Sequence, residues 1–164
     1  MADRSVEIQI MNNSENQFLT TPAVYIYSGY IASLPTPVIN PGKKGNAVFT
    51  KTASTARGSV GVLTYSFGRT QISMLFSNPF DYNLYSMVFA LYIPPLPELT
   101  DENLYYRMYS ELSPSESFAK AELSSGTQKL SVNGGNLVIS ATVKKMDNSL
   151  IHVVITDVYK ASKL

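Results

Sequence analysis

The chain of 164 residues contains no cysteine, no tryptophan and a single histidine. The absence of cysteine excludes disulfide bonds, thiolate catalysis and metal sites with sulfur ligands. A metal site would otherwise need several histidines or clustered carboxylates. A serine triad would have to use His152, which stands in a strand-like stretch with no nucleophile elbow to match it. The sequence therefore argues against an enzyme and against a bound metal or other cofactor.

Charge and long apolar runs are also scarce. Lysine and arginine number 13 against 12 acidic residues, so the formal net charge is +1 and no positive field favours nucleic acid. No run of 18 apolar residues is present, which predicts that the chain has no transmembrane helix. The first ten residues, MADRSVEIQI, hold no apolar signal-peptide centre. The sequence leaves the cellular location open.

What the sequence does have is alternation of apolar and polar residues, the pattern of half-buried β-strands. Val6, Ile8 and Ile10 share one face of a first expected strand. Nine further segments are typical of strands, and they span residues 23–27, 46–51, 59–67, 70–77, 86–93, 117–123, 127–132, 136–145 and 150–159. Gly68-Arg69 makes a tight turn, and NGGN and MDNS are strong hairpin turns between the last three segments.

One segment, TDENLYYRMYSELSP, follows helical spacing instead and predicts a helix of about three turns. Thr100 is expected to cap it, the two acidic residues that follow suit its positive N-terminal end, and Pro114 ends it. With about ten strands and one flanking helix, we predict a mainly β protein. The expected architecture is a β-sandwich that forms a single domain over residues 1–164.

Tyrosine is abundant, with eleven copies, and eight of them cluster in VYIYSGY, NPFDYNLY and LYYRMYSEL. Tyr105 and Tyr109 are four residues apart, so they share one face of the expected helix. Two interpretations are open: the rings pack between helix and sheet as ordinary core, or they wall an aromatic cage. Such a cage suits a quaternary ammonium, which each ring face attracts by about 0.5–2 kcal/mol. Hydroxyl and backbone N–H groups beside it suit a phosphate, and the two together describe phosphocholine.

The stretch GSVGVLTYSFGRTQISMLFSNPFDYNLYS, followed by RMYSELSP, resembles the core of the actinoporins, the sea-anemone pore-forming cytolysins and their relatives. The resemblance covers about residues 5–114. It implies a β-sandwich flanked by two helices that binds phosphocholine and prefers sphingomyelin membranes. It also implies a secreted protein that acts on target-cell membranes and forms homo-oligomers there.

Carried over position by position, the resemblance assigns headgroup-binding roles to seven residues and membrane contact to four. The expected phosphocholine site comprises Ser28, Val60, Ser77, Pro79, Tyr85, Tyr105 and Tyr109. The expected membrane contacts are Phe80, Tyr82, Leu84 and Val88. In this scheme the three tyrosines cage the choline, while the serines and the backbone near Val60 face the phosphate. Aligning the helix on LSP gives this set, aligning it on RMY shifts the match by one turn, and Tyr109 is used in both.

The sequence also departs from the pattern of the family. The family's pore is made by an amphipathic N-terminal helix, and only five residues precede the first expected strand here, whereas a spanning helix needs about 20. We therefore expect membrane binding but do not expect this chain to perforate membranes as it stands. Leu84 and Val88 replace exposed tryptophans, which predicts weaker anchoring, and Phe80 replaces a tyrosine.

Two other hypotheses belong to different functional classes. Fungal fruit-body lectins share the sandwich architecture, and fold alone does not give function. Aromatic turns with Asn and Asp also suit glycans, for which Asp81 and Asn83 are the candidate ligands. A third hypothesis is an oligomeric interaction protein whose exposed apolar turn meets another protein.

Overall fold

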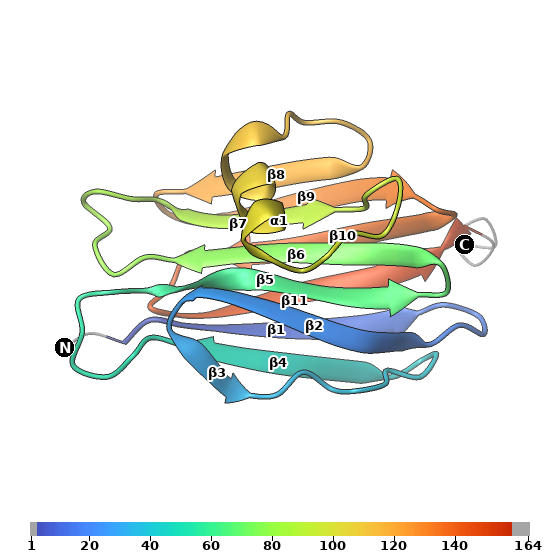
Figure 1. The fold of residues 1–164 in the computed structure, drawn as a ribbon, viewed down its shortest axis with the longest axis horizontal. Helices are drawn as coiled ribbons and strands as arrows, with labels where there is room; N and C mark the ends of the chain where they lie inside the picture. Colours follow the sequence, from blue (N-terminus) through green and yellow to red (C-terminus); the bar gives the residue numbers. More distant parts are fainter. Residues whose placement is uncertain (1–2, 159–164) are drawn as a thin grey trace.

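The computed structural model describes residues 3–158 as two β-sheets packed face to face, with a short helix on one outer face (Figure 1). Sheet A has, in spatial order, β3 (Tyr30–Ser33), β4 (Lys44–Thr50), β1 (Ser5–Asn13), β11 (Asn148–Asp157), β10 (Leu137–Lys144) and β9 (Thr127–Gly134). Sheet B has β2 (Leu19–Ser28), β5 (Ser59–Phe67), β6 (Thr70–Asn78), β7 (Met87–Tyr92) and β8 (Phe118–Leu123). The predicted mainly β sandwich is confirmed, with eleven strands among the described residues instead of about ten.

The strand that the sequence pattern did not predict is β3, at the edge of sheet A beside β4. The chain crosses from sheet B to sheet A at Gly29, whose φ is +93°. A side chain there would collide with the backbone oxygen of Thr50, so the corner needs glycine. β3 has only four residues, all partly or fully exposed, and therefore carries no alternation to detect. The last expected strand is observed as β11, and Tyr159 lies outside the described residues.

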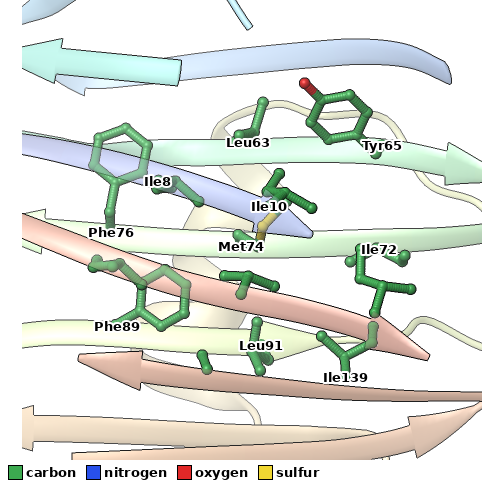
Figure 2. Close-up of a cluster of buried hydrophobic side chains, with 14 of the residues drawn as sticks. Ile8, Ile10, Leu63, Tyr65, Ile72, Met74, Phe76, Phe89, Leu91 and Ile139 are labelled. Carbon is green, nitrogen blue, oxygen red and sulfur yellow. The ribbon is translucent and has the colours of Figure 1, made fainter. Parts of the chain in front are cut away.

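The main core lies between the two sheets, where the alternating residues of the strands meet. In β1, Val6, Ile8 and Ile10 are fully buried while the residues between them are half-exposed. Figure 2 shows the facing side chains of sheet B, among them Met74, Phe76, Phe89 and Leu91. Burial of each such side chain stabilises the fold by about 1.5–3 kcal/mol. The sandwich is thus held together by the same periodicity that predicts its strands.

The three central strands of sheet B are buried on both faces, which explains the nearly unbroken apolar runs of β5, β6 and β7. A second, smaller cluster lies on its outer face, under the helix. Its buried members are Val60, Val62, Leu75, Val88, Ala90, Tyr92, Leu104, Tyr105, Met108 and Phe118. This outer cluster positions the helix and its tyrosines against the sheet.

The helix consists of α1 (Glu102–Tyr106) and a π-helical turn η1 (Arg107–Glu111). Asp101 caps it, because its side chain accepts a hydrogen bond from the backbone N–H of Leu104 at 3.1 Å. The prediction of Thr100 as the cap is therefore wrong, and the Thr100 hydroxyl instead lies 2.6 Å from that of Thr64. Within residues 3–158, no helix combines the length and the apolar character that crossing a bilayer requires.

Candidate functional site

The register of sheet B sets three of the predicted site residues side by side on the face that carries the helix. Ser28 of β2 pairs with Val60 of β5, and Val60 pairs with Ser77 of β6. Ser77 in turn pairs with Val88 of β7. We call these four residues the serine row. It crosses the sheet at the end where β6 leads into the loop of residues 79–86 (Figure 1).

Five tyrosines from two elements gather near the serine row, and we call them the tyrosine cluster. They are Tyr25 and Tyr27 of β2 and Tyr105, Tyr106 and Tyr109 of the helix. Ring centroids are 4.8 Å apart for Tyr27 and Tyr105, and 5.6 Å apart for Tyr105 and Tyr109. These separations are those of aromatic rings in contact. The prediction that Tyr105 and Tyr109 share one helix face is confirmed.

Tyr105 is the buried centre of the tyrosine cluster, with only 5% of its surface exposed. Tyr27 and Tyr109 both stack on it, with interplanar angles of 18° and 28°. Burial raises the pKa of Tyr105, and the neighbouring tyrosines raise it further. Tyr105 therefore has little free ring face to wall a cage, and it supports the outer rings instead. The interpretation as ordinary core therefore fits Tyr105, and the aromatic cage stays a prediction for the outer rings.

The exposed aromatic surface comes from Tyr27, Tyr106 and Tyr85. Tyr85 is 59% exposed in the loop of residues 79–86. Its phenol adds to the rise in the pKa of Tyr109, which burial mainly causes, so the two groups are neighbours. The helix and the loop thus bring rings near one another, and the headgroup-binding roles of Tyr85 and Tyr109 stay predictions.

Tyr27 and Tyr106 are members of this surface that were not among the predicted site residues. The signal for Tyr27 is present in VYIYS, since alternation in a strand places Tyr25 and Tyr27 on one face. A register shift between Ile26 and Ser28 follows, and this irregularity cannot be seen in the sequence. For Tyr106 the sequence shows only that it follows Tyr105, and this does not identify it as a site residue.

The loop of residues 79–86 is a compact turn organised by Asp81. Its carboxylate accepts a hydrogen bond from the N–H of Asn83 at 2.9 Å, and its backbone oxygen accepts from Leu84 and Tyr85 at 3.2 and 3.1 Å. Leu84, next to Tyr85, is 71% exposed. Because the Asp81 carboxylate is used inside the turn, the structure offers no support for it as a glycan ligand.

The other aromatic side chains of this loop lie against cations at its base. The guanidinium carbon of Arg4 lies 4.2 Å from the centre of the Tyr82 ring and 5.4 Å from that of Phe80. The Tyr82 hydroxyl donates to Asn78 Oδ1 at 2.6 Å. Both rings are half-buried, so they hold the loop in place and do not project from it.

The remaining predicted residues at this end are buried, as are Val60 and Ser77 of the serine row. Pro79 is buried at the base of the loop, where its backbone oxygen accepts from Arg4 Nε at 2.8 Å. Val88 is only 4% exposed and belongs to the outer cluster, so its side chain has no surface to offer a membrane in this structure. The expectation for Val88 is corrected accordingly. Of the four predicted membrane contacts, Leu84 projects freely.

Comparison with known proteins gives a consistent family match. The family model described as "Sea anemone cytotoxic protein" matches residues 1–147. The toxin DELTA-alicitoxin-Pse1b of Phyllodiscus semoni is 32% identical over 114 residues, which cover 68% of this chain and 50% of that protein. Hydra actinoporin-like toxin 5 of Hydra vulgaris is 38% identical over 66 residues, which cover 40% of this chain and 33% of that protein. The chain spans about half the length, or less, of these relatives.

Solved structures with the same architecture are much more distant in sequence. The lipid binding protein Nakanori superposes with a TM-score of 0.67 at 12% identity, over 93% of this chain and 70% of that chain. The protein IP-1A from Alcaligenes faecalis superposes with a TM-score of 0.57 at 9% identity, over 94% of this chain and 91% of that chain. At such identities the likeness shows the fold alone.

Proposed function

The chain belongs to the sea anemone cytotoxic protein family, the actinoporin-like cytolysins, and on that premise we propose that it binds membranes by recognising phosphocholine headgroups. The observation that carries the proposal is the placement of the tyrosine cluster beside the serine row, at the end of the sandwich where Leu84 is exposed. Each of these features matches one part of a choline lipid: the aromatic faces match the ammonium, the hydroxyl groups match the phosphate, and the exposed apolar side chain matches the acyl chains.

In the proposed complex, the choline ammonium lies against the exposed rings of Tyr27 and Tyr85 and the half-buried ring of Tyr109. A quaternary ammonium has no N–H to donate, and it is held by ring faces at about 0.5–2 kcal/mol each. Tyr105 fixes the orientation of its neighbours through stacking. Preorganised rings of this kind lose little conformational entropy when the headgroup binds.

The phosphate is assigned to the serine row. The hydroxyl groups of Ser28 and Ser77 are hydrogen-bond donors that suit phosphate oxygens, and Val60 lies between them. Ser77 is only 5% exposed, so the half-exposed Ser28 is the accessible donor of the row. Leu84 would then enter the acyl region of the bilayer from the adjacent loop, which adds an apolar contact. Perforation of the membrane is a separate step from this binding, and it is measured by the release of dye from lipid vesicles.

Cosedimentation with vesicles of sphingomyelin and phosphatidylcholine tests the proposal. The wild-type protein is expected to pellet, and free phosphocholine is expected to compete. Tyr109→Ala should weaken binding about 2- to 30-fold, because it removes one cation-binding ring. Tyr85→Ala should act in the same direction, and since Tyr85 is exposed the loss does not depend on packing.

Phe18→Ala is the matched control, because it removes an exposed ring from the connection between β1 and β2. Its binding should equal that of the wild type. The proposal fails if the wild-type protein ignores an excess of these vesicles, or if both tyrosine variants pellet as well as the control.

A further inference from the structure

The serine row continues one strand beyond Val88. Val88 pairs with Glu122 of β8, so a carboxylate stands at the end of the row that starts with Ser28. Phe118 of the same strand belongs to the outer cluster, and alternation therefore places Lys120 and Glu122 on the helix side of sheet B. None of the predicted site residues lies on this strand.

Lys120 connects the Glu122 carboxylate to the tyrosine cluster. Its Nζ lies 3.4 Å from Glu122 Oε1 and donates to the backbone oxygen of Tyr109 at 2.8 Å. The same ammonium lies 5.9 Å from the centre of the Tyr109 ring. The Lys120 ammonium thus occupies the position between this carboxylate and this ring, and a ligand ammonium has to take its place to contact Glu122.

The charge of Glu122 also reaches the Tyr109 phenol. It contributes to the raised pKa of Tyr109, after the larger effect of burial. The Glu122 side chain itself is well exposed, and it is accessible to a ligand at the surface. Tyr85 and Glu122 are thus both close enough to influence the Tyr109 phenol, and both are exposed.

We propose that Glu122 is a further binding residue of the headgroup site, whose carboxylate attracts the quaternary ammonium and selects headgroups that carry a positive charge. The inference rests on the proposed function and adds to it an anionic group opposite the serine end of the row. Ser77 and Glu122 are two strands apart, about 10 Å at the backbone. Val88 lies between them and is buried, so the headgroup meets Glu122 at the open surface next to Tyr109 and does not lie across the row.

A pair of soluble ligands tests the role of charge. Phosphocholine is compared with 3,3-dimethylbutyl phosphate, which has a neutral tert-butyl group in place of the trimethylammonium. The wild-type protein is expected to prefer phosphocholine in calorimetric titrations at low salt. In Glu122→Gln this preference should shrink about two- to fivefold, the effect of losing one exposed ion pair. A residue with a merely structural role would weaken both ligands equally.

Glu116→Gln is the matched control, since it removes the same charge beyond the opposite end of β8. Its preference should equal that of the wild type. If Glu122→Gln binds phosphocholine and keeps the wild-type preference, the inference is overturned while the proposed function stands. If the wild-type protein binds neither ligand nor vesicles, both are overturned.

Discussion

At the scale of single residues, Arg4 contacts both the backbone and the aromatic rings of the loop of residues 79–86. Only 6% of its surface is exposed, and its guanidinium donates to the backbone oxygens of Pro79 and Phe80 at 2.8 and 2.7 Å. Its Nη1 also lies 3.3 Å from Oδ1 of Asp147, in the connection between β10 and β11. The planar fork of arginine supplies these donors in a fixed geometry.

Arg4→Lys keeps the charge but cannot reproduce the fork, so at least one buried carbonyl should be left without a donor. The expected loss in the free energy of unfolding is about 1–3 kcal/mol. Urea unfolding measures the loss, and faster hydrogen exchange at Leu84 and Tyr85 would locate it in the loop. Arg57→Lys, an exposed change nearby, should shift stability by less than about 0.5 kcal/mol. Equal stability of the Arg4 and Arg57 variants would contradict the role of Arg4 in holding the loop of residues 79–86.

At the scale of elements, the helix is too short to be stable alone, since α1 and η1 have five residues each. It is held by its buried residues, among them Leu104 and Met108, and by its cap. Arg107 adds an ion pair with Glu98 and a hydrogen bond to the hydroxyl of Tyr92 at 3.3 Å. The position of the tyrosine cluster therefore depends on tertiary contacts more than on helix propensity.

Asp101→Ala should lower the free energy of unfolding by about 0.5–2 kcal/mol, because the N–H of Leu104 loses its acceptor. Asp101→Asn keeps a capping oxygen and should remain close to the wild type. Chemical denaturation of the two variants separates capping from charge. Two variants of equal stability would show that the cap contributes nothing to the fold.

Elements were predictable where the local pattern is strong. Alternation and turn residues predict ten of the strands, and the spacing of Leu104 and Met108 predicts the helix. The capping residue of the helix could not be predicted, because Thr100 and Asp101 are both good capping residues. The structure decides between them, since Asp101 has the extended backbone of a cap. The family resemblance read from the sequence is confirmed by the family match.

The site could be predicted from the sequence only where its residues are close together in the chain. The i, i+4 spacing places Tyr105 and Tyr109 together without knowledge of the fold. The directions of Phe80 and Tyr82 depend on Arg4, which is more than 70 residues away in the chain. Glu122 joins the row only through strand register, which a single sequence does not specify.

At the scale of the whole molecule, the two ends of the sandwich differ. The loop of residues 79–86 and the corner after β2 lie at one end, and the connection between β1 and β2 lies at the other (Figure 1). Leu84 and Tyr27 are exposed at the first end and Phe18 at the second. The proposed function requires the first end to meet the membrane.

The absence of tryptophan allows a direct test of this orientation. In Leu84→Trp the single indole should enter the membrane interface, and its emission should shift to shorter wavelength when sphingomyelin vesicles are added. In Phe18→Trp the indole should stay in water and its emission should not change. A shift confined to the Phe18→Trp protein would mean that the molecule lands on its other end.

The parallel pairing of β1 with β11 has a consequence for folding. Ser5 and Asn148, which are neighbours in the middle of sheet A, are 143 residues apart in the chain. Such a non-local contact closes a loop of nearly the whole chain, and topologies rich in such contacts fold slowly. During synthesis β1 has to wait for the last strand to leave the ribosome before sheet A closes. Until then one edge of β1 is without its hydrogen-bonding partner, and unpaired strand edges make such an intermediate prone to aggregation.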